Sequence, residues 1–291
     1  MWHFISEHIS EVTGTLFLCT HVQRVSGGDT HDAYIIHDEH TRYFVKTRAY
    51  DDTQQLHLEA EGLDEINAAN TLLTPRVICW GLTKNEYPQQ EYLVLSHIRF
   101  IAPKDTEFAR LGAQLAAMHS LNKYTQYGWL HDNYIGASIQ TNGRSANWSD
   151  FFAEQRIASM LERLATQGYT FTTSIPVVQL CKDVLSSHCP HPALVHGDLW
   201  HGNIGFCHKG PVVFDPAIYI GDGETDLAMA ELFGGFPTSF FEGYASHTPI
   251  DKNYAKRKLF YQFYHILNHT LLFGAHYQQQ ADTLLQKIKA L

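Results

Sequence analysis

Apolar and polar residues alternate along the first hundred positions in a way that predicts strands around one helix. Alternation over 16–25 and 31–37, across the turn-forming run 26–29, predicts a hairpin, and 42–48, 76–80 and 92–95 predict three more strands. Between them, Leu56, Leu63 and Ile66 recur at helical spacing and predict a helix over 54–70. This part is therefore expected to form a five-stranded antiparallel sheet with one helix.

The pattern becomes mainly helical after residue 103. Apolar residues keep the helical period over 106–121, 148–165, 175–187 and 254–273. The change from strand-rich to helix-rich composition lies near 96–103, so two lobes are predicted, an N-terminal one over 1–96 and a C-terminal one over 97–291. The expected fold class is α+β.

Composition narrows the function classes. The chain has 291 residues and a formal net charge of −9, with no long basic run, which argues against a nucleic-acid partner. Its five cysteines lack C-x-x-C spacing, and its 19 histidines show no pattern typical of a transition-metal site. No signal peptide and no apolar run near the ~18 residues of a membrane span is present, so a cytoplasmic location and no membrane partner are expected.

One stretch carries candidate chemistry. Asp198 and Asn203 lie five positions apart, and Asp215 closes the apolar run 212–214. Kinases use this arrangement to align an attacking hydroxyl with the Asp and to hold magnesium with the Asn and the second Asp. Gly-Asp and Gly-Asn pairs are also common turn formers, so a purely structural interpretation stays open for the pair alone.

Two upstream residues strengthen this interpretation. Lys46 lies on the third predicted strand and Glu59 on the helix, as in kinases where the Lys binds the α- and β-phosphates and the Glu orients it. Glu59 is preferred to Glu61 because it borders the apolar stripe of the helix. Gly27 and Gly28 would let backbone amides approach a phosphate, although a hairpin can use such a pair for its turn alone. The adenine of ATP is expected to meet the backbone at 95–98.

The chain resembles the fructosamine kinase family, relatives of the aminoglycoside phosphotransferases and of protein kinases. The resemblance extends over nearly the whole length, and Gly197-Asp-Leu-Trp200 and Leu232-Phe-Gly-Gly-Phe-Pro237 are its most discriminating parts. It is also carried by Tyr43-Phe-Val-Lys46, Glu59-Ala-Glu-Gly-Leu63, Asn147-Trp-Ser-Asp-Phe-Phe152, Gln155-Arg156 and Phe214-Asp-Pro-Ala217.

The resemblance implies a bilobal protein-kinase-like fold that uses ATP and Mg²⁺ to phosphorylate a sugar hydroxyl of a ketoamine, and hence a role in protein deglycation. It gives Asp198 as catalytic base. The other implied roles are magnesium ligands at Asn203 and Asp215, phosphate binding by Lys46 with Glu59, adenine binding at Ser96, His97 and Ile98, and substrate contacts at Trp200, Glu224 and Asp226.

Several alternatives stay open. Trp200 could be a packed loop residue, and Asp226 could be a helix N-cap. The acceptor could be another small alcohol, such as an aminoglycoside, a choline-like compound or a free sugar, or the chain could be a non-catalytic binding protein.

The chain departs from the family pattern at two positions: Asp29 stands where many relatives have a Cys, and Gly223 where bacterial relatives often have an Arg. The sequence is compatible with a monomer or a homodimer.

Overall fold

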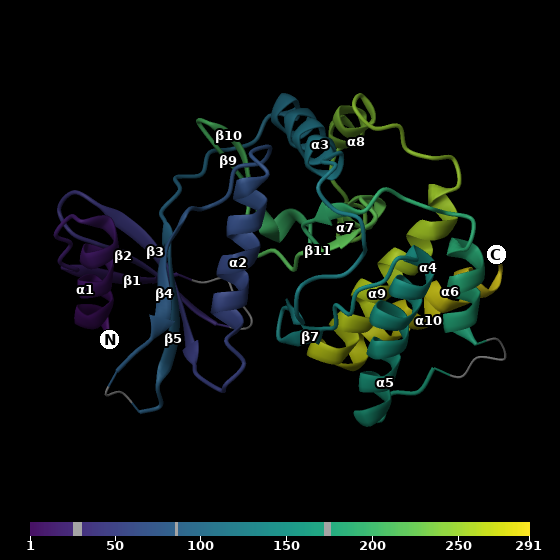
Figure 1. The fold of residues 1–291 in the computed structure, drawn as a ribbon, viewed down its shortest axis with the longest axis horizontal. Coiled ribbons are helices and arrows are strands. Elements are labelled where there is room, and N and C mark those ends of the chain that lie inside the picture. Colours follow the sequence, from purple (N-terminus) through teal and green to yellow (C-terminus); the bar gives the residue numbers. More distant parts are fainter. Residues whose placement is uncertain (26–30, 85–86, 172–175) are drawn as a thin grey trace. The chain divides into compact units, whose positions relative to one another are not determined.

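The computed structural model describes residues 1–25, 31–84, 87–171 and 176–291 (Figure 1). The chain divides into two compact units. Unit 1 contains Met1–Ala102 and Gly205–Asp215, and unit 2 contains Pro103–Ile204 and Pro216–Leu291. The second half of the chain therefore contributes a short segment to unit 1. The boundary between residues 96 and 97 stays a prediction.

Unit 1 is built on the predicted five-stranded antiparallel sheet, in the order β1-β2-β3-β5-β4. Two helices cover its opposite faces, as Figure 1 shows. Successive strand residues point to opposite faces, so Val94 packs in the cluster of α1 while Leu93 and Leu95 pack against α2. The elements are α1 (Trp2–Thr13), β1 (His21–Val25), β2 (Asp32–His37), β3 (Arg42–Ala49), α2 (Gln55–Ala68), β4 (Val77–Leu82) and β5 (Gln90–Ser96).

Two features of unit 1 differ from the prediction. Helix α1, with Ile5 and Ile9 fully buried under the sheet, was not predicted. The first strand was expected from residue 16 and begins at His21, because Phe17 turns into the α1 cluster and its backbone N–H bonds the Ser10 hydroxyl. The alternation of apolar and polar residues over 16–20 therefore arises from packing against α1 and not from a strand.

The late segment of unit 1 is a small hairpin. Strands β9 (Ile204–Cys207) and β10 (Gly210–Val213) pair, and a parallel bridge joins Val212 to Leu73. The ring of Phe214 lies 5.7 Å from that of Phe100. These contacts fix the end of the hairpin, where Asp215 follows.

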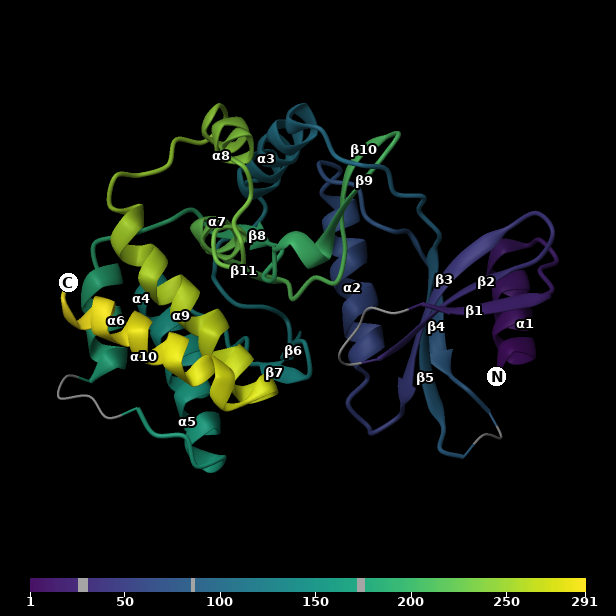
Figure 2. The ribbon, with the colours of Figure 1, turned by 180° about the vertical axis from the view of Figure 1, so that it is seen from behind.

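Unit 2 is mainly helical, with two short two-stranded sheets. Figure 2 shows α10 alongside α9, the long helix whose bounds match the prediction. The described elements of unit 2 are α3 (Asp105–His119), β6 (Asn133–Ile135), β7 (Ser138–Gln140), α4 (Trp148–Phe151), a π-helix η1 (Phe152–Ala158), α5 (Ser159–Thr166), α6 (Val177–Leu185), β8 (Ala193–Val195), a 3₁₀ turn η2 (His201–Asn203), β11 (Tyr219–Gly221), α7 (Glu224–Ala230), α8 (Thr238–Ala245), α9 (Tyr254–Phe273) and α10 (Ala275–Lys289).

The helix predicted over 148–165 is confirmed, but it is not α-helical throughout. It consists of α4, the π-helix η1 and α5 in sequence. A π-helix places its hydrogen bonds one residue further along than an α-helix, and such segments are frequent at functional sites. The apolar period alone does not reveal the change because both forms keep one buried face.

No helix of the described residues is long and apolar enough to cross a bilayer.

Helices α3 and α8 cross at two glycines. A Cβ on Gly112 would lie 2.0 Å from the Phe240 carbonyl oxygen, and one on Gly243 would lie 2.0 Å from that of Ala109. Real Cβ atoms do not approach backbone so closely, so the two helices touch through their main chains. The crossing depends on the absence of side chains at both positions.

We predict that Gly112→Ala destabilises the protein by ~1–3 kcal/mol in urea unfolding, because the overpacking of the crossing outweighs the gain in helix propensity of ~1 kcal/mol. Ala113→Ser on the same helix is the control, with a loss of about 0.5 kcal/mol or less. A more stable Gly112→Ala variant would contradict the crossing.

Candidate active site

A buried lysine stands at the centre of the polar residues of unit 1. Lys46 on β3 is 2% exposed, and its Nζ lies 2.6 Å from Glu59 Oε1 and 2.6 Å from Asp215 Oδ1. Burial alone would lower the pKa of Lys46, but the two carboxylates raise it, so the ammonium stays charged. Burial also raises the pKa of Glu59. The structure thus brings together three of the predicted site residues.

Glu59 reaches Lys46 because β5 caps the start of α2. The buried Glu91 carboxylate accepts the backbone N–H groups of Leu56 and His57 at 2.9 and 3.1 Å. This bond satisfies donors that a helix N-terminus leaves open and fixes the first turn of α2 against the sheet. No local sequence pattern marks Glu91, because it lies on a strand 35 and 34 residues from Leu56 and His57, the residues that it caps. Glu61 lies beside His57 instead.

Asp215 adopts a backbone conformation that is uncommon for its residue type. Its φ is +55°, in the left-handed region, directly after the β9–β10 hairpin. Such conformations cost of order 1–3 kcal/mol for a residue with a side chain and concentrate at functional sites. The turn directs the Asp215 carboxylate to Lys46.

The second group of predicted residues lies on one loop of unit 2. Asn203 Nδ2 donates to the backbone carbonyl of Asp198 at 2.8 Å and to its Oδ2 at 2.9 Å. Both amide protons are therefore directed to Asp198, and the opposite end of the amide presents an oxygen. Carboxylate and amide oxygens are the ligands that Mg²⁺ prefers, so the donor types of Asn203 and Asp215 fit that ion.

Asp226 on α7 holds this loop in place by hydrogen bonds to its backbone. It is fully buried, and it accepts the backbone N–H groups of His196 at 2.7 Å and Gly197 at 2.9 Å. The His119 imidazole lies 3.1 Å from the same carboxylate, and Tyr244 bonds its other nitrogen. Burial alone would raise the pKa of Asp226, but the bonds from His119 and His196 hold it below its usual range. The carboxylate is therefore an ionised acceptor that fixes the residues before Asp198.

The predicted substrate contact of Asp226 stays a prediction; its carboxylate bonds His119, His196 and Gly197. Sequence reasoning missed His119, since nothing near it in the sequence marks it as a partner of a residue 107 positions away.

Trp200 lies at the start of η2 and is 37% exposed. A Cβ on Gly202 would lie 2.3 Å from its ring, so the indole covers the backbone of the loop. The ring meets Phe233 edge-on at 6.2 Å, and Phe233 in turn packs against His269 at 4.6 Å and Tyr277 at 6.4 Å. An aromatic surface thus extends from the loop that carries Asp198.

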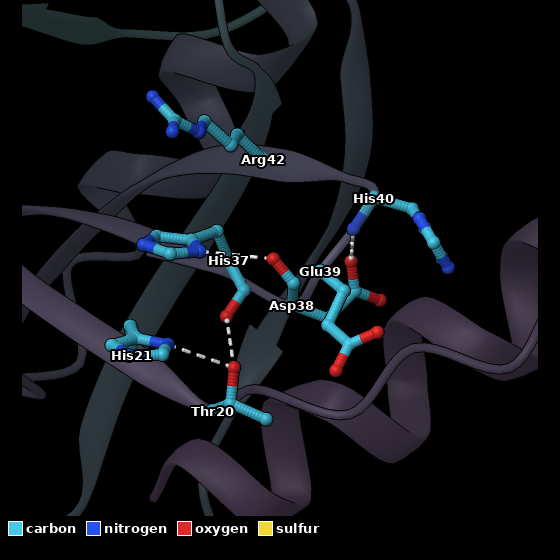
Figure 3. Close-up of a pocket in the computed structure, with 7 residues that line it drawn as sticks. All are labelled: Thr20, His21, His37, Asp38, Glu39, His40 and Arg42. Carbon is cyan, nitrogen blue, oxygen red and sulfur yellow. Dashed lines mark hydrogen bonds between the residues drawn. The ribbon is translucent and has the colours of Figure 1, made fainter.

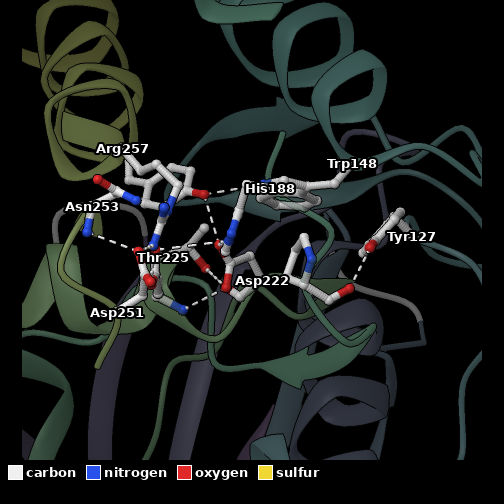
Figure 4. A network of polar contacts seen from close by, with 11 residues as sticks. Tyr127, Trp148, His188, Asp222, Thr225, Asp251, Asn253 and Arg257 are labelled. Carbon is white, nitrogen blue, oxygen red and sulfur yellow. Dashed lines mark hydrogen bonds and ion pairs between the residues drawn. The ribbon is translucent and has the colours of Figure 1, made fainter. Parts of the chain in front are cut away.

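Glu224 belongs to a separate polar network, drawn in Figure 4 around Asp222 and Arg257. Arg257 donates to both Glu224 oxygens at 2.7 Å and to Asp251 at 3.0 Å. Burial raises the pKa of Glu224 and Arg257 opposes the rise. The substrate contact of Glu224 stays a prediction, and the arginine already gives its carboxylate a partner.

The same network contains three metal-ligand types. His188, Asp222 and Glu224 bring one ligand atom each within 4.8 Å of one another. Asp222 already accepts the Tyr261 hydroxyl at 2.7 Å and meets His188 at 2.8 Å, and Arg257 already neutralises Glu224. These bonds stabilise the start of α7 and leave no reason to assign a cation to the cluster.

The remaining predicted nucleotide contacts stay predictions. Gly27 and Gly28, with Asp29, lie outside the described residues. Ser96 ends β5, and its N–H donates to the Arg76 carbonyl at 2.9 Å. His97 and Ile98 follow in an irregular segment, where burial lowers the pKa of His97.

A shallow pocket of unit 1 lies elsewhere on the sheet, near the turn between β2 and β3 (Figure 3). The His21 and His37 rings stack there at 4.7 Å, as partners across β1 and β2. None of the predicted site residues lines it; its lining residues are Thr20, His21, His37, Asp38, Glu39, His40 and Arg42.

Known proteins resemble this chain along its full length. A sequence model described as fructosamine kinase matches residues 1–290. A probable ketoamine kinase from Synechocystis is 42% identical over 287 residues, which cover 98% of this chain and 96% of that protein. The crystal structure of a candidate fructosamine-3-kinase from Haemophilus somnus superposes with a TM-score of 0.93 at 29% identity, covering 99% of this chain and 97% of that one.

A more distant neighbour bears on the fold. The aminoglycoside phosphotransferase APH(4)-Ia has a TM-score of 0.65 at 15% identity, covering 98% of this chain and 99% of that one. The similarity confirms the predicted kinase-like fold and says nothing more specific at that identity.

We predict that Asp226→Asn lowers the free energy of unfolding by ~2–5 kcal/mol, because an amide nitrogen would face a backbone N–H group in a buried site. Urea titration measures the loss. Glu242→Gln, an exposed carboxylate on α8, is the control and should leave the midpoint unchanged. Equal midpoints for the two variants would show that Asp226 does not anchor the loop.

Proposed function

Because this chain belongs to the fructosamine kinase family, we propose that it transfers the γ-phosphoryl group of ATP to a sugar hydroxyl of a ketoamine, a sugar condensed with an amine. One observation carries the proposal beyond the family name. Lys46 is buried with its ammonium held at 2.6 Å by both Glu59 and Asp215, an arrangement that serves to bind and neutralise phosphate oxygens. A single carboxylate balances the charge of a buried ammonium, and here a second one, from the 38% exposed side chain of Asp215, meets the same Nζ.

Each residue has a task in this proposal. Asp198 accepts the proton of the sugar hydroxyl as its oxygen forms a bond to phosphorus and the bond to the ADP oxygen breaks. Lys46, oriented by Glu59, binds the α- and β-phosphates. Asn203 and Asp215 would hold Mg²⁺, which when bound neutralises charge on the phosphate oxygens. Asn203 also orients Asp198 through its two bonds to that residue.

The aromatic surface formed by Trp200 and Phe233 is suited to bind the phosphoryl acceptor. Trp200 exposes a flat apolar ring beside Asp198 in the sequence, and such rings pack on the apolar faces of sugars. Phe233 supports the indole from the side. We infer that this surface receives the sugar or the amine-bearing part of the ketoamine. A role in protein deglycation, a cytoplasmic location and the oligomeric state stay predictions.

We expect Asp198→Asn to lower kcat by ~10³-fold, a barrier increase of ~4 kcal/mol, since the hydroxyl loses its proton acceptor. Coupled ADP-release assays measure kcat, and calorimetry should show MgATP binding within about threefold of the wild type. Asp183→Asn, an exposed carboxylate on α6, is the matched control with unchanged turnover. A folded Asp198→Asn enzyme with near-normal kcat would remove the base assignment.

The acceptor class needs a separate experiment. ADP release should be measured on fructosyl-lysine, ribulosyl-lysine, free sugars, choline and aminoglycosides. We expect the two ketoamines to give kcat/KM at least ~10²-fold above the other alcohols, a difference of ~2.7 kcal/mol in transition-state binding. Preference for a free sugar or an aminoglycoside would reject the ketoamine and keep the kinase. No turnover with any alcohol, together with no MgATP binding, would favour a non-catalytic protein.

A further inference from the structure

Unit 2 contains a chain of buried polar side chains that leads from the π-helix to the backbone after Asp215. It begins at Arg156, which the sequence comparison with the family singled out and the proposed chemistry does not use. Its members are Arg156, Asn142, Asn133 and Gln140, each 5% exposed or less. We call these four residues the amide relay.

Arg156 has an unusual environment for a charged residue. It is fully buried in η1, and its guanidinium lies 4.0 Å from the centre of the Tyr219 ring and 4.8 Å from that of Phe151. In the part of the chain that the structure describes, no ion pair joins it to a carboxylate. Its Nη2 donates to Asn142 Oδ1 at 2.8 Å, and Nη1 donates to the Thr141 carbonyl. The charge is thus directed at amide and carbonyl dipoles.

The guanidinium fixes the orientation of each amide that follows. Arginine has donors and no acceptor, so Asn142 must turn its oxygen to Arg156 and its Nδ2 to Asn133 Oδ1, at 2.9 Å. Asn133 must then turn its Nδ2 to the Ile218 carbonyl, at 2.8 Å. Gln140 donates both to the same Asn133 oxygen at 2.9 Å and to the Ala217 carbonyl at 3.0 Å. Reversing Asn142 or Asn133 would place two donors face to face, and reversing Gln140 would place its oxygen against Asn133 Oδ1 and the Ala217 carbonyl, so the relay has a single arrangement.

The relay ends at Ala217, whose backbone contacts the loop that carries Asp198. The Ala217 N–H donates to the His196 carbonyl at 2.9 Å, and a Cβ on Gly197 would lie 2.0 Å from the Ala217 carbonyl oxygen. Gly197 has a φ of +81°. Ala217 and the loop therefore touch through their main chains, so a shift of Ala217 must move Gly197 and, next to it, Asp198.

Ala217 is also two residues after Asp215, whose left-handed φ requires support from its surroundings. The relay holds the carbonyls of Ala217 and Ile218 by two hydrogen bonds from buried amides. One set of side chains thereby fixes the segment that follows Asp215 and the loop that precedes Asp198.

We propose that the amide relay is a positioning device for phosphoryl transfer: it sets the backbone at Ala217 and Ile218, and so holds both the loop that carries Asp198 and the segment that follows Asp215. The inference rests on the proposed function, in which those two carboxylates are the base and a magnesium ligand. The relay residues touch neither substrate nor ion. They act through Ala217 and Ile218.

Gln140→Met tests the relay, because it removes both N–H donors at similar volume. We expect kcat to fall by at least ~30-fold and the KM for ATP to change by less than about threefold, since Lys46 and Glu59 are untouched. Amide hydrogen exchange should rise by ~10-fold in peptides that cover 196–199 and 215–218, with no change around β3 and α2. Exchange is measured without substrate, so this readout does not depend on activity.

The matched control is Thr270→Val on α9. It also removes a buried hydrogen bond of unit 2, from Thr270 Oγ1 to the Ile266 carbonyl at 2.8 Å, without touching the relay. It should lower stability while kcat and the exchange at 196–199 and 215–218 stay at wild-type values. If Gln140→Met does not fold, Asn133→Asp takes its place: the carboxylate can still accept from Gln140 and Asn142 but cannot donate to Ile218.

The outcomes separate the two hypotheses. Loss of kcat with local exchange in the relay variant, and neither in Thr270→Val, supports the positioning role. A relay variant that keeps kcat within threefold of the control, or one whose exchange rises evenly over unit 2, overturns it. If the wild-type chain phosphorylates no ketoamine, the proposed function fails on its own, and the exchange experiment still decides whether the relay fixes the two segments.

Discussion

The geometry of unit 2 depends on one buried carboxylate. Asp226 carries a charge where water cannot reach it, and the desolvation cost is offset by the His119 imidazole and by the backbone N–H groups of His196 and Gly197. The two backbone N–H groups help to stabilise the charge of Asp226. The same two hydrogen bonds hold the backbone just before Asp198 in one conformation. The backbone position of the candidate base, Asp198, therefore depends on the hydrogen bonds that stabilise the Asp226 carboxylate.

Local patterns were enough to predict much of the fold. Strand alternation predicted the five-stranded sheet, and the helical period over 254–273 gave the bounds of α9. The family suggested by the sequence motifs is confirmed by the match over residues 1–290. Lys46 and Glu59 were paired in advance from the kinase pattern of a strand lysine and a helix glutamate, and the structure places Lys46 Nζ 2.6 Å from Glu59 Oε1. Helical periodicity served to prefer Glu59 to Glu61.

Other features depend on contacts that no short pattern encodes. The Glu91 cap joins a strand to a helix start more than thirty residues earlier, and the partner of Glu224 is Arg257 on α9. Likewise, Arg156 in the middle segment of 148–165 bonds Asn142, which lies outside that helix. In each case the residue type was visible in the sequence, but its partner was chosen by the tertiary fold.

The π-helix has a consequence for how this protein can change over evolution. A π-helical turn holds one residue more than an α-helical turn of similar rise, so η1 behaves as an inserted residue absorbed within a helix. Deleting Ile157 or Ala158 would rotate Arg156 by about 100° relative to the α5 side chains that follow. Substitutions on the outer face of this segment can accumulate, whereas a change of its length by a single residue would turn the guanidinium away from Asn142. The length of this helix is therefore constrained together with the identity of Arg156.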